Sequence, residues 1–248
     1  PEPCDGMPMH GIALLFIAAL AFGGVAWMIP RLMPLFIRYA LARPNIRSSH
    51  RVPTPQGGGA AVALAVLVLT IAAGWAGVAA PGGQDVERYY ALVLASSFAM
   101  ALLGAADDIR PLPAWSRFVI QTALAGIVIF AAPDAWRLFP HILPQALERA
   151  LSVVALVWMI NLTNFMDGID GIVVAEGVPV AATLAGLAAL GLLSGMAGVV
   201  AAALAGALGG FFLFNRHPAK LFLGDVGSLP IGLILGALLF ELACTQSV

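Results

Sequence analysis

Long apolar runs constrain this chain more than any other feature. Its 248 residues are 61% hydrophobic and only 10% charged, and the mean hydropathy is +0.96. Because a helix rises about 1.5 Å per residue, roughly 20 apolar residues cross the hydrocarbon layer of a bilayer. Eight such runs lie at about residues 11–30, 58–80, 89–106, 115–132, 149–163, 172–193, 195–214 and 228–244, the fifth being the shortest. We therefore expect an all-α, polytopic membrane protein with about eight transmembrane helices, forming a single membrane domain over residues 1–248.

The cations are distributed unevenly between the expected loops. If the N-terminus lies outside, nine Lys and Arg residues fall on the cytoplasmic side and three on the outer side. The nine are Arg31, Arg38, Arg43, Arg47, Arg51, Arg110, Arg117, Arg216 and Lys220, and the three are Arg88, Arg137 and Arg149. This bias agrees with the excess of Lys and Arg in cytoplasmic loops of membrane proteins. The net charge of −1 and the absence of a basic run speak against nucleic-acid binding.

Four polar segments interrupt the apolar pattern, and the proposed topology places all of them on the cytoplasmic side. They are residues 43–59 (RPNIRSSHRVPTPQGGG), 104–117 (GAADDIRPLPAWSR), 161–171 (NLTNFMDGIDG) and 214–228 (FNRHPAKLFLGDVGS). The outer connections contain nothing comparable. Since a carboxylate inside a bilayer is costly, aspartates at the ends of apolar helices indicate a functional pocket or a shared aqueous face.

An adjacent pair of carboxylates, Asp107 and Asp108, closes the third apolar run, where Pro111 and Pro113 end the helix. Neighbouring carboxylates raise each other's proton affinity, so that one can act as a general base while a cation holds the other. The plainer interpretation is a solvated helix end with Arg117 extended toward water. The pair alone does not decide between the two.

Polar residues recur at intervals of three in the next segment, at Asn161, Asn164, Asp167 and Asp170. On a helical continuation they would lie on one side. Their hard oxygen atoms suit Mg²⁺, which usually takes one or two protein groups and completes its shell with water and phosphate. A calcium loop is disfavoured because Ile169 stands at its third position. A simple polar turn remains the alternative.

The last polar segment combines cations with a glycine-flanked aspartate, Asp225. Gly224 and Gly227 allow the backbone to approach a ligand closely, and the N-terminus of the following helix favours anions. Carboxylates for Mg²⁺ and cations for phosphates together are typical of phosphoryl transfer. At a membrane surface, this combination predicts a lipid phosphate as one substrate and a soluble diphosphate as the other.

The segments RSSHRVPTPQGGG, DDIRP, NLTNFMDGIDG and NRHPAKLFLGDVGS resemble, in order and spacing, those of the polyprenyl-phosphate N-acetylhexosamine-1-phosphate transferases (glycosyltransferase family 4 type). The resemblance implies transfer of a sugar 1-phosphate from a UDP-sugar to polyprenyl phosphate, with release of UMP. It also implies a need for Mg²⁺ or Mn²⁺. The match covers about residues 43–228.

The resemblance assigns roles to individual residues. Asp107 and Asp108 would be catalytic, with Asp107 keeping the lipid phosphate ionised for attack, and Asp225 and Asn164 would bind the metal. The substrate-binding residues would be Asp167 near the diphosphate, Asp170 near the uridine, Phe222 stacked on the uracil, and Arg117, Asn161, Asn215, Lys220 and His50. Arg117 stands ten residues after Asp107, where many members carry a phosphate-binding Lys. Arginine keeps the charge, although the exchange is not automatically neutral.

The RSSH and PTPxGGG segments are more similar to enzymes that begin O-antigen or exopolysaccharide units, as in lipopolysaccharide synthesis, than to the peptidoglycan-precursor transferase. A donor of the UDP-N-acetylglucosamine type, or a deoxy relative such as N-acetylfucosamine, is therefore expected. The partners implied are undecaprenyl or another polyprenyl phosphate, the UDP-sugar, the bilayer and a second copy of the chain in a homodimer. The location implied is the bacterial inner membrane, with the active site facing the cytoplasm.

Two departures from the family pattern leave alternatives open. Gln56 stands where relatives often have a basic residue. The family usually continues through further helices and a His-containing loop after the GDxGS segment, so the chain is expected to be C-terminally incomplete or a short member. An inactive membrane homologue acting as a scaffold is one alternative. A secondary transporter is another, although transporter sites usually lie near the bilayer midplane in repeated halves.

Overall fold

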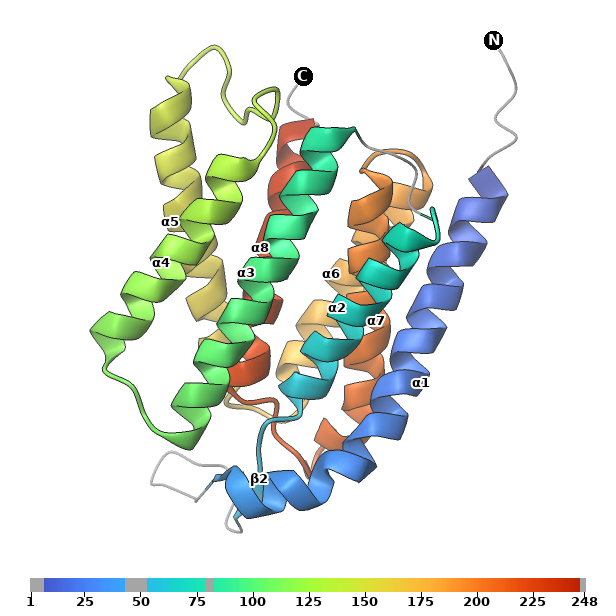
Figure 1. Ribbon diagram of the computed structural model, residues 1–248, viewed down its shortest axis with the longest axis vertical. Helices are drawn as coiled ribbons and strands as arrows, with labels where there is room; N and C mark the ends of the chain where they lie inside the picture. Colours follow the sequence, from blue (N-terminus) through green and yellow to red (C-terminus); the bar gives the residue numbers. More distant parts are fainter. Residues whose placement is uncertain (1–6, 43–52, 79–82, 246–248) are drawn as a thin grey trace.

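The computed structural model describes residues 7–42, 53–78 and 83–245. They form one helical bundle (Figure 1). The helices are α1 (Met7–Tyr39), α2 (Gly59–Trp75), α3 (Gln84–Ile109), α4 (Ala114–Ala131), α5 (Gln145–Met166), α6 (Ile172–Ala189), α7 (Gly195–Asn215) and α8 (Asp225–Thr245). Two short strands, β1 (Leu41–Ala42) and β2 (Thr54–Pro55), form a two-residue antiparallel pair. The all-α, polytopic prediction is confirmed.

Each predicted apolar run corresponds to one helix. Seven of the described helices are long and apolar enough to cross a membrane, whereas α2 has 17 residues and is shorter. The centre of the bundle is formed by α7 and α8, the most buried of these spans. Helices α1, α2 and α6 pack around α7, while α3 and α5 pack against α8. Small residues at α7 positions such as Gly206 and Gly210 let α1 approach closely, as is usual between membrane helices.

The fifth helix corrects the predicted boundaries. The apolar run 149–163 was expected to be the shortest span, but α5 has 22 residues, Gln145–Met166. Its charged first turns remain helical because their charges are satisfied inside the protein. Arg149 donates to the carbonyl oxygen of Ile129, near the end of α4, at 2.8 Å, and to that of Pro133, just after α4, at 2.7 Å. A hydropathy pattern alone cannot reveal such pairing.

The described parts of all four polar segments lie at one end of the bundle, at the bottom of Figure 1. Helices α3, α5 and α7 end there, and α2, α4 and α8 begin there. The last turns of α1 bend across this end, following Pro30 and Pro34 within the helix. The fold therefore brings together helix ends that are far apart in the sequence.

Candidate active site

Glycines allow the N-terminus of α8 to lie directly against two other helices. A Cβ atom added at Gly59, the first residue of α2, would lie 2.1 Å from the Cα atom of Gly227. One added at Gly104 of α3 would lie 2.2 Å from the carbonyl oxygen of Asp225. No side chain fits in these gaps. The glycines are thus required for packing, which brings the end of α3 to the start of α8.

The PTPQGGG segment pairs by its backbone with the residues before α8. The N–H of Phe222 donates to the carbonyl of Pro55 at 2.8 Å, and the N–H of Gly58 donates to the carbonyl of Phe222 at 3.0 Å. A third bond of 2.9 Å joins Gly59 N–H to the carbonyl of Leu223. These bonds hold the loop that carries Asp225 in a fixed position.

Asp108 caps the N-terminus of α8. Its Oδ1 accepts from the N–H of Asp225 at 3.1 Å, and its Oδ2 accepts from the N–H of Val226 at 3.2 Å. A carboxylate in this position satisfies free backbone donors and interacts favourably with the helix dipole. The side-chain amide of Gln56 adds a longer contact of 3.4 Å to Asp108 Oδ1. Asp108 therefore links the end of α3 to the start of α8.

Arg117 joins two further carboxylates, those of Asp107 and Asp225. Its Nη1 atom lies 2.6 Å from Asp107 Oδ2 and 3.2 Å from Asp225 Oδ2. Asp107 Oδ1 also accepts from the N–H of Leu112 at 2.6 Å. The Asp107 side chain is 13% exposed and that of Arg117 31%, so the pair is partly withdrawn from water. Arg117 Nε is buried without a partner in the described structure.

Two residues at the end of α5 complete the cluster. Asn164 donates to Asp225 Oδ1 at 2.7 Å and to the Ser228 hydroxyl at 2.8 Å. Asp167 Oδ2 accepts from the N–H of Gly224 at 3.2 Å. Burial raises the pKa of Asp167 well above its usual range; the Gly224 N–H opposes this rise, and the charges of Asp225 and Asp108 add to it. The described cluster thus contains one cation, Arg117, and four carboxyl groups, those of Asp107, Asp108, Asp167 and Asp225.

Asp170 and Asn215 lie in a second group of contacts. Asp170 Oδ2 accepts from the N–H of Ala219 at 3.0 Å and lies 3.0 Å from Nδ1 of His217. Asn215 is buried; it accepts from the N–H of Gly171 at 2.8 Å and donates to the carbonyl of Leu221 at 3.0 Å. Asn215 therefore connects the α5–α6 turn to the segment before α8, and its two polar side-chain atoms are both used within the protein.

The remaining predicted residues have different surroundings. Lys220 is exposed at the same end of the bundle, and the side chain of Phe222 is half-buried. His50 lies outside the described residues. Asn161 is exposed on α5, where it donates to the Gln121 side chain at 2.9 Å and to the carbonyl of Val157 at 2.8 Å. The structure thus gathers Asp107, Asp108, Arg117, Asn164, Asp167 and Asp225 in one cluster and places Asp170 and Asn215 beside it.

A pocket of about 380 Å³ opens next to this cluster, between α4 and α5. It is lined by Ala114, Trp115, Arg117, Phe118, Gln121, Asn161 and Asn164. Its polar residues lie beside Asp225, whereas Trp115 and Phe118 are 72% and 56% exposed on the surface of α4. Sequence reasoning missed Gln121, Trp115 and Phe118. The one available signal was an amide side chain within an apolar helix.

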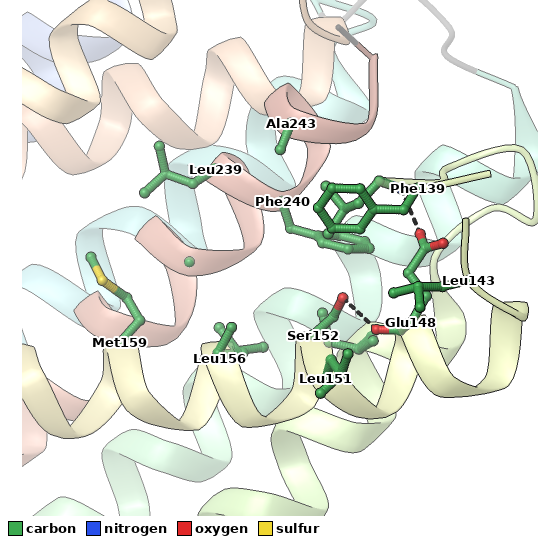
Figure 2. Close-up of a pocket in the computed structure, with 14 residues that line it drawn as sticks. Phe139, Leu143, Glu148, Leu151, Ser152, Leu156, Met159, Leu239, Phe240 and Ala243 are labelled. Carbon is green, nitrogen blue, oxygen red and sulfur yellow. Dashed lines mark hydrogen bonds between the residues drawn. The ribbon is translucent and has the colours of Figure 1, made fainter. Parts of the chain in front are cut away.

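A larger pocket, of about 430 Å³, lies at the opposite end of α5 (Figure 2). Most of its lining is apolar, contributed by α5, α8 and the α4–α5 connection. Its polar groups are satisfied: Ser152 donates to the carbonyl of Glu148 at 2.9 Å, and the Glu148 carboxylate pairs with Arg137 at 2.9 Å. This pocket contains none of the carboxylates of the cluster.

Comparison with known proteins assigns most of the chain to one family. Residues 90–243 match the model of glycosyl transferase family 4. The chain belongs to this family. A decaprenyl-phosphate N-acetylglucosaminephosphotransferase of Mycolicibacterium smegmatis is 31% identical, covering 94% of this chain and 60% of the relative. A probable undecaprenyl-phosphate N-acetylglucosaminyl 1-phosphate transferase of Bacillus subtilis is 31% identical, covering 78% and 52%.

Family members with a different named substrate match as well. A phospho-N-acetylmuramoyl-pentapeptide-transferase of Heliobacterium modesticaldum is 31% identical, covering 90% of this chain and 73% of the relative. The chain spans about 60% of the length of the mycobacterial relatives it matches. The family resemblance expected from the four polar segments is confirmed.

Proposed function

We propose that the protein transfers a sugar 1-phosphate from a UDP-sugar to a polyprenyl phosphate, giving a polyprenyl-diphosphate sugar and UMP. The observation that carries the proposal is the bridge from Arg117 to Asp107 and Asp225, at the edge of a pocket between two membrane helices. The names of the relatives support it, since they act on decaprenyl or undecaprenyl phosphate. Arg117, held by two carboxylates beside a pocket with exposed rings, can donate charge-assisted hydrogen bonds to the phosphate of a lipid.

The pocket between α4 and α5 is the proposed position of the lipid phosphate. Its polar side has Arg117, which can donate to phosphate oxygens, and its other side has the exposed rings of Trp115 and Phe118. A polyprenyl chain would extend along these rings into the bilayer, where burial of apolar surface is favourable. The phosphate would then lie within reach of Asp107.

Asp107 is the residue proposed to assist the attack. An oxygen of the lipid phosphate would form a bond to the sugar-bearing phosphorus of the UDP-sugar, and the bond from that phosphorus to the bridging oxygen would break. UMP leaves with the bridging oxygen. Because a phosphate monoester is already largely ionised near neutral pH, with a second pKa of about 6, Asp107 would contribute by removing any remaining proton and by positioning the phosphate through Arg117.

The soluble substrate is proposed to bind between the α5–α6 turn and the segment before α8. Asp167 would lie near the diphosphate and Asp170 near the uridine, with Phe222 against the uracil and exposed Lys220 supplying positive charge. The contacts of Asp170 with Ala219 and His217 favour this position, because they fix the carboxylate at the edge of the site. Catalysis here depends mainly on positioning and charge stabilisation.

The donor atoms of the cluster fit a hard divalent cation such as Mg²⁺, with Mn²⁺ as an alternative. The described residues contain no group of three or more His, Cys, Asp or Glu placed as a metal cluster. Mg²⁺ typically needs only one or two carboxylates together with substrate phosphates and water. Asp225 would hold the ion, and Asn164 would orient the Asp225 carboxylate. When bound, the ion would offset the charge of the diphosphate.

For the donor we propose a UDP-N-acetylglucosamine type of sugar nucleotide, used to begin a cell-envelope polysaccharide such as an O-antigen. The names of the mycobacterial and Bacillus relatives support an N-acetylglucosamine donor. The proposed location is the bacterial cytoplasmic membrane, with the carboxylate cluster facing the cytoplasm, as the excess of cations at that end suggests.

The test is to incubate the purified chain in lipid nanodiscs with polyprenyl phosphate, Mg²⁺ and a panel of UDP-sugars, and to measure UMP. We expect UMP release that requires both the lipid and Mg²⁺, and that is fastest with a UDP-N-acetylhexosamine. Folded protein that releases no UMP with any donor would contradict the proposal and favour a scaffold role.

A further inference from the structure

Gln121 is a buried amide in an otherwise apolar helix, and its contact crosses to a neighbouring helix. Its side chain is 3% exposed. Its Oε1 atom accepts from Asn161 Nδ2 at 2.9 Å, and the same nitrogen donates to the carbonyl of Val157 at 2.8 Å. Both amide protons of Asn161 are therefore used. The bond connects α4 to α5.

This contact lies one helical turn from the carboxylate cluster on both helices. Gln121 follows Arg117 by four residues on α4, and Asn164 follows Asn161 by three on α5, so each pair shares a helix face. Arg117 and Asn164 both reach Asp225, at 3.2 Å and 2.7 Å. The pocket between α4 and α5 is lined by the side chains of both pairs, Arg117 and Gln121 on α4 and Asn161 and Asn164 on α5.

Burial explains why the Gln121 contact matters for the position of Arg117. The buried residues of α4 are Gln121, Ala125, Val128 and Ile129. None of the residues from Ala114 to Ile120 is buried, so the turn carrying Arg117 lacks apolar packing of its own. Between membrane helices, where packing has little hydrophobic drive, a hydrogen bond between side chains helps to hold one helix against the next. Gln121 is thus the first buried residue of α4, four positions after Arg117.

We propose that Gln121 is a positioning residue for the lipid phosphate: its bond to Asn161 sets α4 against α5, so that Arg117 faces the phosphate at the required place. This inference rests on the proposed function. It assigns to Gln121 an effect on the lipid substrate and none on the nucleotide, because the proposed nucleotide residues lie on the α5–α6 turn and before α8.

The experiment uses the full chain in nanodiscs and compares Gln121→Leu with two further variants. The exchange Gln121→Asn with Asn161→Gln keeps both amides and the combined side-chain length between the helices. The control, Thr122→Val, removes a hydroxyl that bonds only within α4, to the carbonyl of Phe118 at 2.8 Å. KM and kcat are measured separately for polyprenyl phosphate and UDP-sugar.

For Gln121→Leu we expect KM for polyprenyl phosphate to rise about tenfold, the factor that corresponds to one hydrogen bond of about 1.4 kcal/mol. KM for the UDP-sugar should change less than about twofold, a difference of under about 0.5 kcal/mol. The exchanged pair should recover most of the lipid affinity, and Thr122→Val should behave as the unaltered chain. Equal losses for both substrates, or no recovery in the exchanged pair, would overturn the inference.

A binding titration separates this inference from the proposed function. Short-chain polyprenyl phosphate is titrated against the unaltered chain and Gln121→Leu, without UDP-sugar. Weaker binding to the variant supports the role of Gln121 even if no transfer is seen, in which case only the proposed reaction fails. Equal binding to both proteins would overturn the role while leaving the proposed function intact.

Discussion

At the scale of single residues, Arg117 forms ion pairs with both Asp107 and Asp225, which are 118 positions apart in the sequence. One nitrogen serves both, so a change in either carboxylate alters the surroundings of the other. These two carboxylates exceed the single charge of Arg117, and Asp108 and Asp167 lie beside them. Anionic substrates would be repelled by this surplus unless a cation accompanied them, which is the physical reason to expect a metal ion here.

Asp107→Asn should lower turnover while leaving nucleotide affinity nearly unchanged. A missing general base typically costs about 10² to 10⁴ in rate, and the loss should lie at the low end because the lipid phosphate is already largely ionised. Rates with limiting lipid are measured against pH. Partial recovery at higher pH indicates a base role, and no recovery indicates positioning.

The matched control for this change is Asp134→Asn, at an exposed carboxylate bonded to Gln145 at 3.0 Å. It should keep full activity, since this exposed carboxylate lies in the α4–α5 connection, at the opposite end of the bundle from the cluster. Normal rates in Asp107→Asn would contradict a catalytic role for Asp107 and would support the alternative, a charge at a solvated helix end.

Asp225→Asn should reduce activity by about 10² or more, the loss typical for one strong electrostatic contact in a catalytic site. If Asp225 holds the metal, the variant should also need a higher Mg²⁺ concentration for half-maximal rate. A Mg²⁺ titration of both proteins, after removal of bound metal with a chelator, measures this. An unchanged Mg²⁺ requirement would remove Asp225 from the metal site.

Asp167→Asn should make the substrate-free protein more stable at neutral pH while impairing transfer. Since burial raises the pKa of Asp167, its ionised form is disfavoured in the folded state. The cost is absent below the usual Asp pKa of about 3.9 and grows as the pH rises from there toward the raised pKa. Thermal unfolding of both proteins at pH 4 and pH 7 tests this: the variant's advantage should appear only at the higher pH.

At the scale of helices and loops, apolar run length predicted the number and order of the helices well, because crossing a bilayer requires a fixed length. The ends were less predictable. Helix α5 begins at Gln145, before the apolar run, because carbonyl groups at and just after the end of α4 accept protons from Arg149 in its first turns. Such a partner cannot be seen in a local pattern.

The same limit applies to the candidate site. The spacing of Asn164, Asp167 and the Asp107–Asp108 pair indicated which segments meet, because their polarity requires a shared aqueous face. Almost nothing in the sequence indicated that Gln121 belongs to the site, because its role depends on a hydrogen bond to Asn161, which lies 40 positions away. The backbone pairing of Pro55 with Phe222 was also hidden, because main-chain contacts leave little trace in side-chain identity.

Gly59→Ala should destabilise the protein and reduce activity. The added Cβ would lie 2.1 Å from the Cα atom of Gly227, so α2 and α8 must separate, at a cost of about 1–3 kcal/mol for overpacking. Gly126→Ala is the matched control, because nothing lies within 4 Å of a Cβ at that helical position. The melting temperatures should fall for the first variant and stay equal or rise for the second.

At the scale of the whole molecule, the described motif residues lie at one end of the bundle (Figure 1). Single cysteines at exposed positions Arg110, Ile169 and Lys220, in a background lacking Cys4 and Cys244, should therefore react with an impermeant thiol reagent from the same side of the membrane. A cysteine at exposed Ile142, in the α4–α5 connection, should react from the other side. Labelling of the first three from different sides would contradict a single site.

The capping of α8 by Asp108 has a consequence for synthesis of the protein. Asp108 accepts a hydrogen bond from the N–H of Asp225, which is synthesised 117 residues later. Until α8 inserts, Asp107 and Asp108 must stay hydrated at the membrane surface, without the backbone donors that will later hold Asp108. The nascent chain therefore carries no assembled site while α1 to α7 are being synthesised, and the insertion of α8 creates the site.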